Sequence, residues 1–140
     1  MRQLRLALFI VVSTSTGATF NTVLKHGFAR LRPDLVPHDV IVANASFPSG
    51  HAFGAAMVYL TLASLLTLRL EPWGARATLL ALAIALTLAV GVSRVVLGVH
   101  WPSDVLAGWS AGSAWALAAW LIATVTGWFD RTSRSTPFHW

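Results

Sequence analysis

Three cationic side chains stand out in this largely apolar chain because their types suit the binding of a phosphoryl group. They are Lys25, Arg32 and Arg94. Arginine binds phosphate oxygens through two parallel hydrogen bonds, and lysine binds them as a compact point charge. Taken singly, each cation also fits an anchor at the end of a membrane span. Taken together, they predict an anion-binding site.

The segment Pro-Ser-Gly-His at residues 48–51 predicts the first turn of a helix. Ser49 fits the N-cap position, and the free N–H groups of such a turn favour a bound anion. Gly50 has no side chain, so the backbone can approach a ligand closely. This segment therefore adds backbone donors to the same kind of site.

Two histidines and an aspartate supply the groups needed to cleave a phosphate ester. His51 and His100 can act as proton donor and nucleophile. Asp104 follows His100 by four residues, so the two share a face of a helical turn, and Pro102 fits the start of that helix. A carboxylate placed there fixes the histidine tautomer and stabilises its cationic form. The set predicts phosphoryl transfer in which cations, and no metal, provide the electrostatic stabilisation.

The spacing of these residues resembles the three-part signature of the type 2 phosphatidic acid phosphatase family, which also includes bacterial acid phosphatases and vanadium haloperoxidases. The matching residues are Lys25, Arg32 and Pro33; Pro48, Ser49, Gly50 and His51; and Ser93, Arg94, His100 and Asp104. All of them match in order and in spacing, which is far more specific than a single short motif.

The resemblance implies a role for each matching residue. His100 would attack phosphorus and become phosphohistidine, Asp104 would orient it, and His51 would protonate the leaving oxygen and then activate water. The phosphoryl oxygens would be held by Lys25, Arg32, Ser49, Gly50 and Arg94. The family's reaction needs no metal or cofactor. Its membrane members act on lipid phosphates at a site that faces away from the cytoplasm.

Four apolar stretches are long enough to cross a bilayer, which takes roughly 20 residues in a helix. They cover residues 4–24, 49–70, 77–93 and 105–129. Their lengths and the absence of period-two alternation predict helices, not barrel strands. Gly108 and Gly112 would let two helices approach closely. The expected fold is an all-α integral membrane bundle of four helices, one domain over residues 1–140, with an outer loop at residues 31–47.

The order of the spans brings the chemical residues together on one side of the membrane. The other side carries six arginines, at positions 2, 5, 69, 76, 131 and 134. The positive-inside rule places these arginines in the cytoplasm. We therefore expect cytoplasmic termini and a site that faces outward from a bacterial cytoplasmic membrane. Arg30, Asp34 and Asp39 would pair with one another in the outer region.

Composition agrees with a membrane protein. Of the 140 residues, 56% are hydrophobic and 11% are charged, whereas a soluble domain carries about 25% charged residues. The net charge of +5 is spread singly between apolar runs, which excludes the clustered basic patch of a nucleic-acid-binding protein. The chain has no cysteine, which excludes disulfides and thiolate metal sites.

The sequence leaves three alternatives open. A phosphotransferase would use the same residues but pass the phosphoryl group to an acceptor other than water. A non-catalytic subunit would bind lipid or a partner. The resemblance gives weight to this second reading, since membrane members have six spans and helices from an upstream segment or a partner chain would complete the bundle. The N-terminus also fits a signal peptide, but its apolar core of seven residues favours a retained span.

Overall fold

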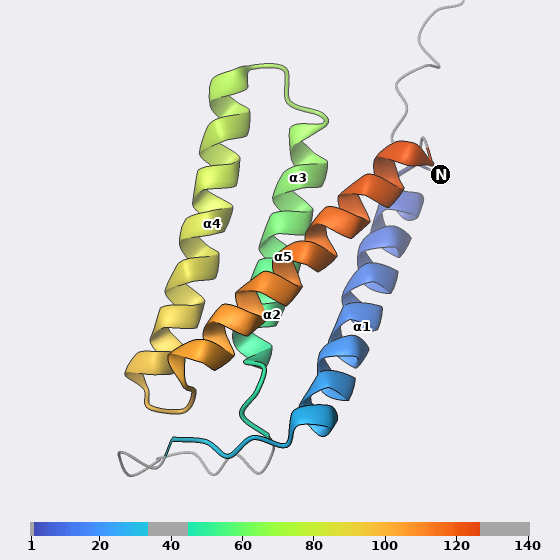
Figure 1. The fold of residues 1–140 in the computed structure, drawn as a ribbon. Coiled ribbons are helices and arrows are strands. Elements are labelled where there is room, and N and C mark those ends of the chain that lie inside the picture. Colours follow the sequence, from blue (N-terminus) through green and yellow to red (C-terminus); the bar gives the residue numbers. More distant parts are fainter. Residues whose placement is uncertain (1, 34–44, 127–140) are drawn as a thin grey trace, which may run out of the picture.

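The computed structural model describes residues 2–33 and 45–126, which form four helical rods running alternately up and down (Figure 1). The rods are α1 (Arg2–Phe28); a composite of α2 (Gly50–Ala55), the π-helical segment η1 (Ala56–Leu60) and α3 (Thr61–Thr67); α4 (Trp73–Val96); and α5 (Pro102–Val125). Each contains a stretch long and apolar enough to cross a membrane. The described residues are helical with connecting segments, which confirms the expected fold class.

Helix α1 continues beyond residue 24, where the first span was expected to end. The threonine hydroxyls of its polar middle donate to carbonyls one turn earlier, as at Thr16 and Thr19, so these residues are accommodated within the helix. The helix stops where Ala29 takes a left-handed conformation with φ of 42°. Lys25 therefore lies in the last turn of α1 and not in the loop after it.

The composite rod begins where expected and ends earlier. Ser49 is its N-cap, and its hydroxyl accepts from the Ala52 N–H at 3.4 Å. The rod ends at Thr67 instead of residue 70, because the next residues form a turn that leads to Pro72. A proline ring cannot continue a preceding helix.

The last two helices begin earlier than hydropathy alone indicates. Helix α4 starts directly after Pro72 and ends at Val96, so Arg94 belongs to its last turn instead of flanking it. Helix α5 starts at Pro102 instead of residue 105, because proline is favoured in the first turn of a helix. It is described as far as Val125, and the expected residues 127–129 lie outside the described part. So do residues 34–44 of the expected outer loop.

Helix α5 packs most closely on α2 and η1, along the face that carries Gly108 and Gly112. A methyl group on Gly108 would lie 2.7 Å from the Ser49 carbonyl oxygen. A methyl group on Gly112 would overlap the Phe53 carbonyl oxygen. The two backbones therefore approach as closely as the glycine spacing predicts.

We expect Gly112→Ala to lower the free energy of unfolding by about 1–3 kcal/mol, because the added methyl group overpacks the α2–α5 contact. The matched control is Gly54→Ala, since a methyl group on Gly54 would meet no atom within 4 Å. Thermal unfolding in detergent, followed by circular dichroism, compares the two. Equal stability of the two variants would contradict the packing argument.

Candidate active site

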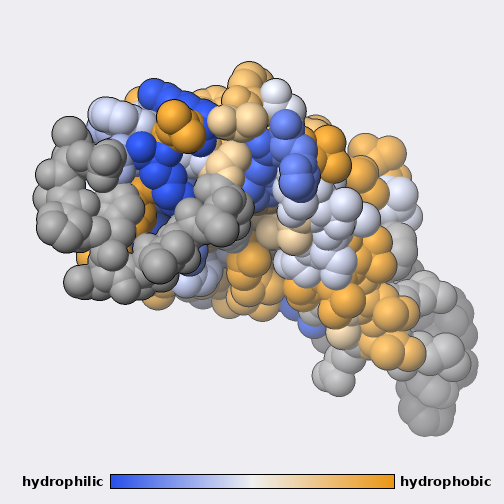
Figure 2. Space-filling model, turned by 90° about the horizontal axis from the view of Figure 1, so that it is seen from below, coloured by the Kyte–Doolittle hydropathy of each residue, from blue (hydrophilic) through white to orange (hydrophobic). Residues whose placement is uncertain are grey.

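The site lies at the end of the bundle where α1 and α4 finish and where α2 and α5 begin (lower end in Figure 1). Seen from that end, hydrophilic side chains gather in the upper part of the view, and hydrophobic side chains cover much of the lower and right-hand parts (Figure 2). The residues that follow α1 and those that precede α2 cross this end. The order of the spans predicts this meeting of helix ends.

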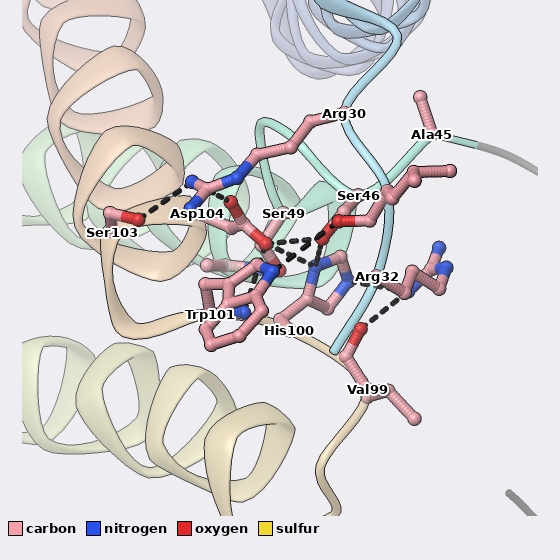
Figure 3. Close-up of polar contacts among 12 residues, drawn as sticks. Arg30, Arg32, Ala45, Ser46, Ser49, Val99, His100, Trp101, Ser103 and Asp104 are labelled. Carbon is pink, nitrogen blue, oxygen red and sulfur yellow. Dashed lines mark hydrogen bonds and ion pairs between the residues drawn. The ribbon is translucent and has the colours of Figure 1, made fainter. Parts of the chain in front are cut away.

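Asp104, in the first turn of α5, is completely buried and surrounded by donors (Figure 3). Its Oδ1 pairs with Arg30 Nη1 at 2.9 Å. Its Oδ2 accepts from the Trp101 N–H at 2.9 Å and from the Ser46 hydroxyl. Its backbone carbonyl accepts from the Ser49 N–H at 2.9 Å. These donors suit an ionised carboxylate, and the last bond fixes α5 against the start of α2.

His100 is 4% exposed and lies between Asp104 and Arg32 (Figure 3). Its Nδ1 is 3.5 Å from Asp104 Oδ2, and its Nε2 is 3.3 Å from Arg32 Nη1. A guanidinium can only donate, so Nε2 must carry the lone pair and Nδ1 must carry the proton. This tautomer makes Nε2 the nucleophilic atom and directs the Nδ1 proton toward Asp104.

The environment of His100 keeps its ring neutral. Burial and then the positive charge of Arg32 lower the pKa of His100 to about 4, although its hydrogen bond to Asp104 acts in the opposite direction. At neutral pH the Nε2 atom is therefore unprotonated and keeps the lone pair that a nucleophile requires.

Two predicted phosphate-binding cations are held by backbone carbonyls of the segments that border the site. Lys25 Nζ donates to the Ala45 carbonyl at 2.6 Å. Arg32 Nη1 donates to the Val99 carbonyl at 2.8 Å as well as to His100. These bonds bring both cations to the end of the bundle that holds His100, and both charges act on its ring.

His51 and Arg94 lie at the same end of the bundle but are less closely tied to the cluster. His51 is an exposed residue in the first turn of α2, and the charges of Arg94, Lys25 and Arg32 act on it. Arg94 Nε donates to its neighbour Ser93 at 3.2 Å. Among the described residues, no hydrogen bond or ion pair joins His51 or Arg94 directly to His100, so a bound substrate would have to bridge them.

Arg30 and Ser46 belong to this site although the sequence motif does not mark them. The structure shows Arg30 bonded to Asp104 across the bundle end, a contact that the sequence did not indicate, and the expected pairing of Arg30 with Asp34 and Asp39 stays a prediction. Asp34 and Asp39 lie outside the described residues. The sequence could have predicted that Asp104 has a partner, since a buried carboxylate requires a cation or a hydrogen-bond donor. It could not identify Arg30 as that partner, because the two residues are far apart in the sequence.

Within residues 2–33 and 45–126, no group of three or more His, Asp or Glu side chains could hold a metal ion. The groups that remain are a neutral imidazole, the carboxylate that faces it and several cations. This arrangement can attack an electrophile that carries negative oxygens, with the cations binding those oxygens.

The fold and the site define an integral membrane helical bundle that gathers two histidines, an aspartate and several cations at one end. A family model described as the PAP2 superfamily matches residues 6–128. The chain belongs to this superfamily.

Individual relatives fit this assignment. The chain is 41% identical over 107 residues to phosphatidylglycerophosphatase B of Bacillus subtilis strain 168, covering 75% of this chain and 52% of the relative. It is 34% identical over 117 residues to undecaprenyl-diphosphatase of Sulfolobus acidocaldarius, covering 80% of this chain and 52% of the relative. The chain thus spans about half the length of these curated relatives.

A solved structure has the same fold. It is the crystal structure of a transmembrane PAP2-type phosphatidylglycerolphosphate phosphatase from Bacillus subtilis, with a TM-score of 0.78 and 35% sequence identity. The similarity covers 84% of this chain and 59% of that chain. It supports the description of this protein as an integral membrane protein.

Proposed function

We propose that this protein hydrolyses a lipid phosphate or pyrophosphate through a phosphohistidine intermediate. The observation that carries the proposal is the neutral His100, with Asp104 at Nδ1 and Arg32 at Nε2. The relatives named phosphatidylglycerophosphatase B and undecaprenyl-diphosphatase support a lipid phosphate as the substrate class.

In the first step, Arg32 transfers its hydrogen bond from Nε2 to a phosphoryl oxygen, which frees the lone pair of His100. Nε2 attacks phosphorus in line, the bond to the ester oxygen breaks, and His51 gives its proton to the leaving oxygen. The positive charge that develops on the imidazole is stabilised by Asp104.

In the second step, His51 accepts a proton from water, and the hydroxide formed attacks phosphorus. The bond between phosphorus and Nε2 breaks, inorganic phosphate leaves, and His100 returns to its neutral form. In both steps the charge on the phosphoryl oxygens would be bound by Lys25, Arg32, Ser49, Gly50 and Arg94. Preorganised donors of this kind stabilise charge that develops in the transition state.

The proposed orientation places residues 1–140, as a single domain, with termini in the cytoplasm and the site on the outer face. Arg69 and Arg76 lie at the α3–α4 end of the bundle, opposite the site. Together with Arg2, Arg5, Arg131 and Arg134 in the sequence, they favour the cytoplasmic side by the positive-inside rule. A lipid phosphate of the outer leaflet could then reach the site.

The test is phosphate release by the purified chain in detergent with excess EDTA, on a panel of lipid monophosphates and diphosphates. We expect phosphate release that EDTA does not inhibit. The rates of release on the different lipids should rank their head groups. Release that depends on an added alcohol, with the phosphoryl group recovered on that alcohol, would instead indicate a phosphotransferase. A folded protein that acts on no lipid of the panel would contradict the proposal.

A further inference from the structure

Asp104 has more partners than the orientation of one histidine requires. Arg30 occupies Oδ1 at 2.9 Å, and Trp101 N–H and the Ser46 hydroxyl occupy Oδ2. The contact of Oδ2 with His100 Nδ1, at 3.5 Å, is much longer than those of Arg30 and Trp101. Since a buried charge must be balanced by neighbouring groups, Arg30 and the two Oδ2 donors balance most of the charge of Asp104, and His100 balances less.

Arg30 is held so that it can act on His100 only through Asp104. Its Nη1 also donates to Ser103 Oγ at 2.8 Å, and its guanidinium carbon lies 5.7 Å from the centre of the Trp101 ring. The Arg30 side chain is 41% exposed, whereas Asp104 is completely buried. The arginine thus covers the solvent-facing side of the carboxylate and leaves the side that faces His100 open.

Ser46 lies on that other side of the carboxylate. It is completely buried, and its backbone N–H donates to the Arg30 carbonyl at 2.8 Å, which joins the segment before α2 to the segment after α1. The Ser46 hydroxyl donates its proton to Asp104 Oδ2, so its oxygen can still accept a hydrogen bond from another group. His100 Nδ1 lies 3.5 Å from this oxygen. The Nδ1 proton is therefore shared between Asp104 and Ser46.

We propose that Arg30 and Ser46 are positioning residues that hold the Asp104 carboxylate in place and share its charge, so that Asp104 orients His100 without drawing a second proton onto its ring. This inference rests on the proposed function. The proposal gives neither residue a contact with the phosphoryl group. Arg30 acts through Asp104, and Ser46 acts through Asp104 and through its own contact with Nδ1 of His100.

The proposal gives a sign for the titration of His100. Lys25 from α1, Arg32 after α1 and Asp104 from α5 act directly on His100. Among the described residues at the same end of the bundle, Arg30 pairs with Asp104, and His51 from α2 and Arg94 from α4 lie near the other cations. Arg30→Gln removes the cation that balances Asp104, so the pKa of His100 should rise toward its ordinary value. Ser46→Ala removes one donor from Asp104 Oδ2 and should raise the pKa of His100 by a smaller amount.

The experiment follows the His100 ring directly by NMR of histidine-labelled protein in detergent, with His100→Gln to assign its signal. We expect the titration midpoint to rise by about one pH unit in Arg30→Gln and by less in Ser46→Ala. Arg30→Lys keeps the positive charge, so its titration midpoint should lie close to the wild-type value. Ser103→Ala removes a contact of Arg30 but none of Asp104, and it is the matched control with an unchanged midpoint.

Activity gives a second readout. We expect kcat/KM at neutral pH to fall about 10- to 100-fold in Arg30→Gln and Ser46→Ala, by analogy with the groups that orient metal-binding histidines through a hydrogen bond. The acid limb of the plot of kcat/KM against pH should shift to higher pH together with the NMR midpoint. A loss of activity with no shift of the midpoint would mean that the two residues only support the fold, and it would overturn the proposal.

The two proposals fail in different ways. If wild-type protein releases no phosphate, the proposed hydrolysis fails, but the NMR midpoints still decide whether Arg30 and Ser46 control His100. If Arg30→Gln does not fold, Ser46→Ala and Arg30→Lys still give the comparison. Identical midpoints in wild type and Ser46→Ala would then overturn the inference.

Discussion

The His100→Ala protein is expected to lose at least about 10⁴-fold in kcat for phosphate release, because the nucleophile of the proposed reaction is removed. Lys25 and Arg32 would remain in place, so substrate should still bind with a similar KM. The loss should also remove the phosphoenzyme. A bond between phosphorus and an imidazole nitrogen is labile to acid and stable to alkali, so alkaline quenching with radiolabelled substrate should trap it in wild type only.

The matched control for this variant is His26→Ala. His26 is an exposed residue in the last turn of α1, and the proposed mechanism gives it no part. We expect its variant to retain wild-type activity and to form the same phosphoenzyme. A His100→Ala protein within tenfold of the wild-type rate, or a labelled intermediate that survives the substitution, would exclude His100 as the nucleophile.

The second large effect is expected for Asp104→Asn, which should reduce both stability and rate. An asparagine amide has one acceptor oxygen and one NH₂ group, so it cannot accept from Arg30 and from Ser46 and Trp101 at once. Leaving a buried donor without its acceptor costs about 1–3 kcal/mol. The loss of the ion pair adds less than it would for a fully buried pair, because Arg30 is 41% exposed and water can hydrate it. The rate should fall about 10⁴-fold, as in other enzymes in which the carboxylate behind a catalytic histidine becomes an amide.

A double-mutant cycle with Arg30→Gln tests the reason for the loss of stability. In wild type, Arg30→Gln removes a partner of a buried carboxylate. In the Asp104→Asn background it removes an unpaired cation instead, so it should destabilise the protein much less or even stabilise it. Thermal unfolding in detergent measures all four proteins. Additive effects would contradict a direct ion pair, and an Asp104→Asn protein with wild-type rate would contradict the orienting role.

The four-helix fold could be predicted because each span is long, apolar and bounded by charges or prolines. The helix ends were less predictable from hydropathy, which averages over a window of residues. Lys25 and Arg94 lie within the last turns of their helices, because the helical backbone continues as long as hydrogen bonds and caps allow. The cap at Ser49 and the first turn at Pro102 follow from residue type, and the structure confirms both, although the apolar span was expected to begin only at residue 105.

The site was predictable where the chemistry depends on local spacing. His100 and Asp104 are one turn apart, and the structure places them side by side. The roles of these residues and of the cations remain predictions. Arg30 and Ser46 were not predictable, because their contacts with Asp104 depend on how the segments after α1 and before α2 cross the bundle end. No periodicity in the sequence encodes that crossing.

The close packing of α5 on α2 has a consequence for how the bilayer acts on the protein. The Ser49–Asp104 backbone bond and the glycine contacts join these helices, and α4 packs on α2 as well as on α5. Helix α1 packs least closely on the others, and the Trp115 indole bonds α5 to the Ser13 carbonyl of α1. A thicker or thinner bilayer tilts helices at modest energetic cost. The two histidines and Arg94 would keep their spacing while Lys25 moves with α1, so lipid thickness should alter substrate affinity before it alters the chemical step.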